Sequence, residues 1–292
     1  DGLDPETVAR LTNADLLLAL HARRSASIVA WWQARCPGRP LIVALSGTDL
    51  YRDMPDDSAA MRSAEAADRL IVLQGAAADR VGRLRNEWGE KTTVIHQSVE
   101  PPVPHRRPAP GELRVVVLAH LRQVKDPLLA ARAAALLPPS SQVTVHHAGR
   151  AFDDEWTQAA RSAEMANPRY HWHGELGRRE ALDLLASGHA LACTSLSEGG
   201  ANVVSEAIAV GVPVIGTRID GNTGLLGDDH PGLVPVADAV ALAGLLASME
   251  NDGELLADLQ RRTDELRPIT DPAVEQAALA AVVDGVQTIR PN

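Results

Sequence analysis

Short apolar runs rich in leucine and β-branched residues alternate along the chain with alanine-rich amphipathic stretches. This alternation is typical of strands joined by crossover helices in a parallel sheet, and it predicts the α/β class. We expect strands at residues 14–20, 41–45, 70–73, 93–96, 113–119, 143–147, 169–173, 190–195, 212–217 and 232–236. We expect helices at residues 25–35, 58–67, 126–136, 153–166, 178–187, 201–210, 238–249, 254–265 and 272–288.

A proline-rich stretch divides these elements into two sets. Residues 101–111, PPVPHRRPAPG, contain five prolines and no apolar periodicity, which is typical of an extended connector. We expect an N-terminal domain at residues 1–108 and a C-terminal domain at residues 109–292, two Rossmann-like, doubly wound sheets facing each other across a cleft. The second domain closes on a helical tail, whose last helix is a candidate to pack back on the first domain. The chain starts at a helical pattern without methionine, so we expect that the opening of the first domain is missing.

Composition narrows the class of protein. The 292 residues carry a net charge of −10, which disfavours electrostatic binding of nucleic acid. Cys36 and Cys193 lie in dissimilar contexts and support neither a disulfide nor a metal knuckle, so a cytoplasmic setting is expected. The sequence has no run of 18 uncharged apolar residues and no signal-peptide pattern, so we expect no membrane partner. It has no P-loop and no GxGxxG, which counts against an ATPase or a nicotinamide enzyme, and it leaves the oligomeric state open.

One strand–loop–helix segment of the second domain combines a glycine pair with two carboxylates. Glu198, Gly199 and Gly200 form the loop, and a nearly all-apolar helix begins near Ala201. Two glycines at a helix start let the backbone approach a ligand, and the free amides there favour a phosphate. Glu206 on this helix must find hydrogen-bond donors or raise its pKa, and ribose hydroxyls would supply such donors. The alternative is a glutamate at the domain rim that binds no ligand.

Histidines and acidic pairs are the remaining candidates for metal binding. His171 and His173 alternate on one strand, but no third ligand of suitable spacing is evident, so a partly buried strand pair is the better interpretation. Three aspartate pairs occur at helix starts or turns, where aspartate is expected as a cap: Asp56-Asp57, Asp153-Asp154 and Asp228-Asp229. We therefore expect no metal site.

Polar side chains follow the strands of the first domain. Three of them are arginines, whose guanidinium groups bind phosphate oxygens in pairs, so we expect an acceptor that carries a phosphate. The alternative is that Arg23 and Arg24 open a helix and pair with acidic neighbours at the surface. His21 and Asp49 are candidates for orienting a ligand or carrying a proton. The acceptor-binding candidates are Arg23, Arg24, Thr48, Arg52, Gln74, Gln97 and Ser98.

The second domain resembles the retaining GT-B glycosyltransferases known as family 4. The resemblance rests on two glutamates eight positions apart, the glycine pair between them, and the Glu-Ala and Gly-Val-Pro-Val that follow. It implies that Glu198 contacts the donor sugar and that Glu206 binds the ribose. It also implies that the amides of Gly199, Gly200 and Ala201 contact the diphosphate.

The same resemblance implies a basic pair in the segment AHLRQVKDP. Lys125 matches the lysine of this family, and either His120 or Arg122 is its partner. Gly174 and Leu176 complete the donor-binding candidates.

Most of the chain is also similar to the selenosugar synthases of selenoneine biosynthesis, the SenB family, a divergent GT-B group. The similarity is carried by ALHARRSA, SGTDLYRD, ADRLIVLQ and HLRQVKDP. It implies transfer of the sugar of a UDP-sugar, such as UDP-N-acetylglucosamine or UDP-glucose, to selenophosphate. A carbon–selenium bond forms, and UDP and phosphate are released. The resemblance implies small-molecule substrates as partners and no cofactor.

The leading hypothesis is therefore a metal-independent selenosugar synthase. Lys125, with Arg122 or His120 and the helix amides near Gly200, would offset the charge on departing UDP. Glu198 would contact the sugar, and His21 and Asp49 would orient groups or carry a proton. One alternative is an ordinary GT-B glycosyltransferase with a hydroxyl or phosphorylated acceptor. Another is a non-catalytic nucleotide-sugar sensor, which the complete donor set disfavours.

Overall fold

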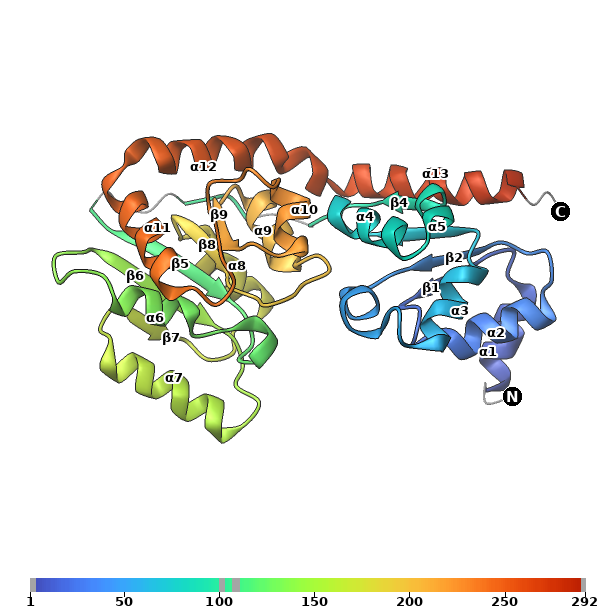
Figure 1. Cartoon of the computed structure of the whole chain (residues 1–292), viewed down its shortest axis with the longest axis horizontal. Helices are drawn as coiled ribbons and strands as arrows, with labels where there is room; N and C mark the ends of the chain where they lie inside the picture. The colour runs from blue at the N-terminus through green and yellow to red at the C-terminus, as the bar shows by residue number, and fades with distance from the viewer. Residues whose placement is uncertain (1–3, 100–102, 107–110, 290–292) are drawn as a thin grey trace. The chain divides into compact units, whose positions relative to one another are not determined.

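The computed structural model describes residues 4–99, 103–106 and 111–289 (Figure 1). The chain divides into two compact units. The first unit holds the described residues within Asp1–His96, Glu198–Gly200 and Ala273–Asn292, and the second holds those within Gln97–Ser197 and Ala201–Pro272. The boundary expected between residues 108 and 109 lies outside the described residues.

A four-stranded parallel sheet forms the centre of the first unit. Its strands are neighbours in chain order: β1 (Leu17–Leu20), β2 (Leu41–Ala44), β3 (Arg69–Val72) and β4 (Thr92–Val94). The helical elements of this unit are α1 (Pro5–Asn13), α2 (Ala26–Arg35), η1 (Asp49–Asp53), α3 (Ser58–Ala66), α4 (Gly75–Leu84), α5 (Asn86–Glu90) and α13 (Pro272–Ile289).

Both faces of this first sheet are covered. Because successive side chains of a strand point to opposite faces, Val43 joins the cluster that buries Trp32 and Trp88, while Ile42 joins a second cluster. The second cluster contains Val282 and Val286 of α13. The last helix thus packs on the first sheet.

A six-stranded parallel sheet forms the centre of the second unit, in the order β10-β9-β8-β5-β6-β7. Its strands are β5 (Leu113–Leu118), β6 (Val143–Ala148), β7 (Tyr170–Trp172), β8 (Ala190–Cys193), β9 (Val214–Thr217) and β10 (Leu233–Val234). Its helical elements are η2 (Gln123–Lys125), α6 (Leu129–Ala135), α7 (Asp154–Ala166), α8 (Arg178–Ala186), α9 (Asn202–Val210), α10 (Asp220–Leu226), α11 (Ala239–Asn251), α12 (Gly253–Leu266) and η3 (Arg267–Thr270).

This strand order is the doubly wound order, because the chain starts in the middle at β5, moves outward through β6 and β7, and returns to the other side at β8. The reversal between β5 and β8 creates a switch point at the carboxyl ends of these strands. Ligands of such sheets bind there. The fold therefore directs attention to the residues that follow β5 and β8.

Helix ends agree with the capping pattern of the sequence. Asp57 caps α3 by accepting hydrogen bonds from two backbone amides, and Asp153 caps α7 by accepting one from Trp156. The interpretation of these aspartates as caps is confirmed. Gly211 ends α9 with a φ of 88°, which a residue with a Cβ rarely adopts. In the described part of the chain, no helix has the length and apolar character needed to span a bilayer.

Candidate active site

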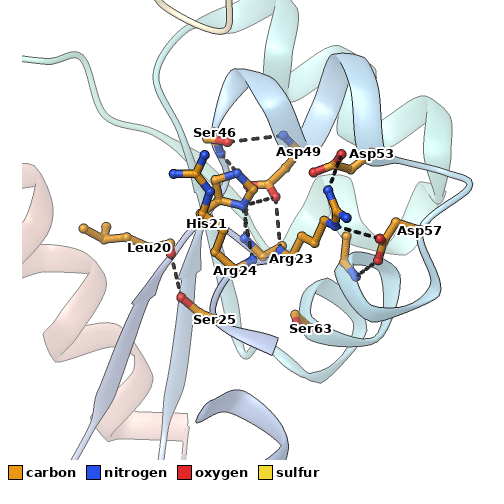
Figure 2. Close-up of polar contacts among 12 residues, drawn as sticks. Leu20, His21, Arg23, Arg24, Ser25, Ser46, Asp49, Asp53, Asp57 and Ser63 are labelled. Carbon is orange, nitrogen blue, oxygen red and sulfur yellow. Dashed lines mark hydrogen bonds and ion pairs between the residues drawn. The ribbon is translucent and has the colours of Figure 1, made fainter. Parts of the chain in front are cut away.

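His21 and Asp49 form a polar pair after β1 and β2 (Figure 2). His21 Nδ1 lies 2.6 Å from Asp49 Oδ1, and the Asp49 side chain is wholly buried. Its carboxylate also accepts hydrogen bonds from the backbone amides of Ala22, Arg23 and Ser46, at 3.0, 3.2 and 2.8 Å. Because a carboxylate only accepts hydrogen bonds, Nδ1 of His21 carries the proton in this contact. Nε2, the other ring nitrogen, is buried and has no hydrogen-bond partner among the described residues.

The local backbone explains how these two side chains meet. His21 has a φ of 70°, a left-handed conformation that turns the chain at the end of β1. Asp49 begins η1, a single turn of π-helix, an element that occurs frequently at functional sites. Since β1 and β2 are parallel neighbours, their carboxyl ends lie at one edge of the sheet.

The three predicted acceptor arginines differ in their ion pairs. Arg23 Nη1 lies 3.5 Å from Asp53 Oδ1, and Arg23 Nε lies 3.0 Å from Asp57 Oδ2 (Figure 2). Arg24 and Arg52 are exposed, and neither has an ion pair within the residues that the structure describes. Pairing with acidic neighbours thus applies to Arg23, whereas the charges of Arg24 and Arg52 are available to a ligand.

The other acceptor candidates lie in different surroundings. Thr48 is exposed directly before η1. Gln74 is wholly buried, and its side-chain oxygen accepts a hydrogen bond from the Ala77 amide at 3.0 Å, which caps α4. Gln97 and Ser98 belong to the second unit, so the structure does not group them with the arginines. Acceptor binding by these residues stays a prediction.

His21, Asp49 and Asp53 each place one ligating atom within 4.8 Å of the others, which is a spacing that suits a metal ion. The hydrogen bonds favour a different role. Three backbone amides and one imidazole already match the roughly four lone-pair positions of the Asp49 carboxylate. The arrangement therefore fits an oriented imidazole better than a metal site.

In the second unit, the loop that carries Lys125 is fixed to the end of β8. Thr194 Oγ1 lies 3.1 Å from the carbonyl oxygen of Lys125 and 3.0 Å from that of Asp126, so its hydroxyl donates to this pair. The amide of Leu196 donates to the carbonyl of Val124 at 2.8 Å. These bonds place Lys125 at the switch point between β5 and β8.

Glu206 lies on the largely buried helix α9, and it has one charged partner. Burial raises the pKa of Glu206 above its ordinary value, and the guanidinium of Arg178 opposes that rise. Arg178 Nη1 lies 3.3 Å from Glu206 Oε1. The sequence predicted that this carboxylate must find hydrogen-bond donors or raise its pKa. The structure has a guanidinium beside it and a raised pKa. Arg178 itself was not predicted, because an arginine in the first turn of a helix is an ordinary surface residue.

The remaining donor candidates are backbone positions. Gly174 turns the chain with a φ of 70°, and its carbonyl accepts a hydrogen bond from the Gly149 amide at 2.7 Å. Leu176 is half-buried before α8, and Ala201 is the residue that precedes the first turn of α9. Residues 198–200 are assigned to the first unit, whereas Lys125 and Glu206 belong to the second. Donor binding by these residues stays a prediction.

Sequence reasoning missed Arg150 and Phe152, which lie beside the predicted basic pair. The Phe152 ring has Arg122 Cζ 4.3 Å and Arg150 Cζ 5.2 Å from its centroid. His120 contacts the same ring edge-on at 5.4 Å, and its Nδ1 accepts a hydrogen bond from the Arg150 amide at 3.0 Å. The sequence signal that could have found them is a basic or aromatic residue at every second position after β5 and after β6.

The histidine pair at β7, with His171 on the strand and His173 directly after it, has a third neighbour that the sequence did not reveal. His146 on β6 is the register partner of His171, and its Nδ1 lies 3.1 Å from Nε2 of His173. Burial is the first cause that lowers the pKa of His146 to about 4. The sequence did not reveal this neighbour, because parallel pairing brings distant residues side by side. That the histidines form no metal site stays a prediction.

Residues 105–265 match the family model of the glycosyl transferases group 1. This match covers more than half of the 292 residues, so the chain belongs to that family, and it is a glycosyltransferase by family. Comparison with curated protein sequences gave no match.

Solved structures of glycosyltransferases share the fold. HepE from Anabaena, crystallised with UDP, has a TM-score of 0.79 and 18% sequence identity over 96% of this chain and 81% of its own. The same protein with UDP-glucose gives a TM-score of 0.75 at 17% identity, over 97% and 81% of the two chains. Sucrose-phosphate synthase from Thermosynechococcus elongatus has a TM-score of 0.76 at 17% identity, over 97% and 77%. The predicted GT-B fold is confirmed.

Proposed function

We propose that this group 1 glycosyltransferase is a selenosugar synthase, which transfers the sugar of a UDP-sugar to selenophosphate. The donor part of the proposal is supported by the switch point of the second unit, where Lys125 and Arg122 follow β5. It is also supported by Glu206, a largely buried carboxylate suited to ribose hydroxyls. HepE, which has the same fold, was crystallised with UDP and with UDP-glucose.

The acceptor part rests on one observation in the first unit. Arg24 and Arg52 are exposed cations without an ion pair among the described residues, and each lies three positions after a member of the oriented His21–Asp49 pair. A neutral sugar acceptor gives no reason to keep such charges uncompensated, whereas a phosphate ligand does. Selenophosphate carries that phosphate together with a nucleophilic selenium atom.

The reaction follows from these roles. A selenium lone pair attacks C1 of the donor sugar, the C1–Se bond forms, and the bond from C1 to UDP breaks with its electron pair leaving on UDP. Lys125 and Arg122 offset the charge that develops on UDP, and removal of one such donor typically costs about 100-fold or more in kcat. Water then cleaves the Se–P bond, which releases phosphate and leaves the selenosugar. We propose that Nε2 of His21 carries the proton that this hydrolysis transfers.

An assay of UDP release tests the proposal. We expect UDP release from UDP-N-acetylglucosamine or UDP-glucose to depend on selenophosphate and not on a sugar alcohol or a sugar phosphate. Release that a hydroxyl acceptor supports better would favour the ordinary glycosyltransferase. Binding of the UDP-sugar without turnover of any acceptor would favour the sensor.

A further inference from the structure

The carboxyl ends of β5 and β6 carry four side chains that face the same way. β5 and β6 are parallel, and their pairing continues beyond the strands through a bridge between Leu121 and Ala151. Side chains alternate between faces with a period of two. His120 and Arg122 follow β5 and lie on either side of this bridge, as Arg150 and Phe152 do after β6, so the four side chains share one face.

The contacts within this group are cation–π contacts. Phe152 is 48% exposed, and the guanidinium groups of Arg122 and Arg150 both lie over its ring, at 4.3 and 5.2 Å from the centroid. The face of an aromatic ring carries negative charge density and attracts cations. One ring thus gathers two positive groups that repel each other.

No carboxylate offsets these two charges. Within the described part of the chain, neither Arg122 nor Arg150 has an ion pair, although the protein has ten more acidic than basic residues. The stacked arginine of α7 is different, because Arg161 lies 4.9 Å from the Trp172 ring and also pairs with Glu164 at 2.8 Å. An uncompensated pair of guanidinium groups on an exposed ring is suited to an anion with more than one negative charge.

The backbone beneath the group is fixed. A Cβ at Gly149 would lie 1.8 Å from the carbonyl oxygen of Ala119, so only glycine allows the two loops to approach this closely. Nε2 of buried His147 lies 2.8 Å from the same Ala119 oxygen, and the Leu121 amide donates to the carbonyl of Arg150 at 2.9 Å. The backbone that carries both arginines is therefore fixed before any ligand binds.

We propose that Arg150 and Arg122, held by Phe152, bind the diphosphate of the nucleotide donor, with Arg150 a direct ligand and Phe152 a positioning residue. This inference rests on the proposed function, because it assigns the diphosphate to the same end of the second sheet. It also resolves the choice of partner for Lys125. His120 is committed through Nδ1 to the Arg150 amide, so Arg122 is the residue that supplies charge.

Calorimetry on the full chain tests this assignment with three probes: UDP, UMP and inorganic pyrophosphate. We expect Arg150→Gln to weaken UDP and pyrophosphate by roughly tenfold or more and UMP by much less. Phe152→Leu should weaken UDP in the same direction, and Phe152→Tyr should retain most of the affinity because the ring is kept. Arg161→Gln is the matched control, a stacked arginine outside the group, and should bind UDP as the parent does.

The outcomes separate this inference from the proposed function. If the parent binds UDP and both Arg150→Gln and Phe152→Leu bind it equally well, the assignment is wrong while the donor proposal stands. If the parent binds pyrophosphate through Arg150 but does not bind UDP, the anion site stands and the proposed donor is wrong. Melting temperatures near that of the parent exclude misfolding as the cause of a weaker affinity.

Discussion

At the scale of single residues, the structure distinguishes arginines that form ion pairs from arginines that form none among the described residues. Arg23 is paired with Asp53 and Asp57, whereas Arg24 and Arg52 are exposed without an ion pair in the described ranges. Three residues of similar sequence context therefore have different electrostatic surroundings. Burial likewise distinguishes Glu206 from the aspartates that cap helices.

We expect Arg24→Gln or Arg52→Gln to raise the KM for selenophosphate by roughly tenfold to 100-fold, because each removes a charged hydrogen-bond donor from the acceptor's phosphate. Steady-state kinetics at saturating donor measures this change. Arg23→Gln is the matched comparison and should mainly lower the melting temperature, since it leaves the buried Asp53 carboxylate without its counter-ion. Unchanged KM in both of the first two variants would contradict a phosphate-bearing acceptor.

We expect Glu206→Ala to weaken UDP itself by roughly tenfold to 100-fold, because the variant loses hydrogen bonds to the ribose hydroxyls. Glu198→Ala should weaken the UDP-sugar or slow transfer and leave the affinity for UDP nearly unchanged. Calorimetry with both ligands separates the two effects. An equal loss of UDP affinity in the two variants would show that the roles are assigned wrongly.

At the scale of elements, buried polar bonds support the loop after β5. His147 on β6 accepts a hydrogen bond from the Tyr170 hydroxyl at Nδ1, 2.7 Å away, and donates from Nε2 to the Ala119 carbonyl at 2.8 Å. The bond to Ala119 needs a proton on Nε2, and acceptance at Nδ1 from the Tyr170 hydroxyl needs the neutral imidazole. Burial is the main cause that lowers the pKa of His147 from 6.5 to about 4.

This pKa predicts how stability depends on pH. As pH falls, the unfolded chain binds a proton at this histidine near pH 6.5, while the folded protein binds it only near pH 4. The stabilising contribution is therefore complete above pH 6.5 and is lost by pH 4. Between about pH 7.5 and 5, chemical denaturation should show the parent losing about 2 kcal/mol more unfolding free energy than His147→Gln. Parallel losses in the two proteins would contradict this.

The apolar pattern predicted the strands of both sheets, because most of them are short buried runs between turn-forming residues. Some helical elements were not predicted. The sequence of α10, DGNTGLL, contains two glycines and no clear period, and η1 is a π-helical turn without a sequence signature. The group around Phe152 was not predicted either, because its members follow two different strands and meet only through the register of those strands.

At the scale of the whole molecule, the two units carry different candidate groups for the two proposed substrates. The second unit has the doubly wound order with Lys125 at its switch point, and the first has the His21–Asp49 pair beside exposed arginines. In both units the groups suited to anions are cations and backbone amides. Carboxylates such as Asp57 and Asp153 serve as helix caps.

This distribution of charge predicts that turnover does not depend on a divalent cation, since the charge of the leaving diphosphate is offset by side chains. Activity should be the same before and after extensive treatment with EDTA. A loss of activity in EDTA that magnesium or manganese restores would contradict the proposed charge compensation by Lys125 and Arg122.

The most direct test of the central claim is mass analysis of the product formed from a UDP-sugar and selenophosphate. The account predicts a species that contains the sugar and one selenium atom, formed in equal amounts with UDP and phosphate. Its selenium isotope pattern and fragmentation should place selenium on C1. A product without selenium, or UDP release only with a hydroxyl acceptor, would contradict the account and identify an ordinary glycosyltransferase.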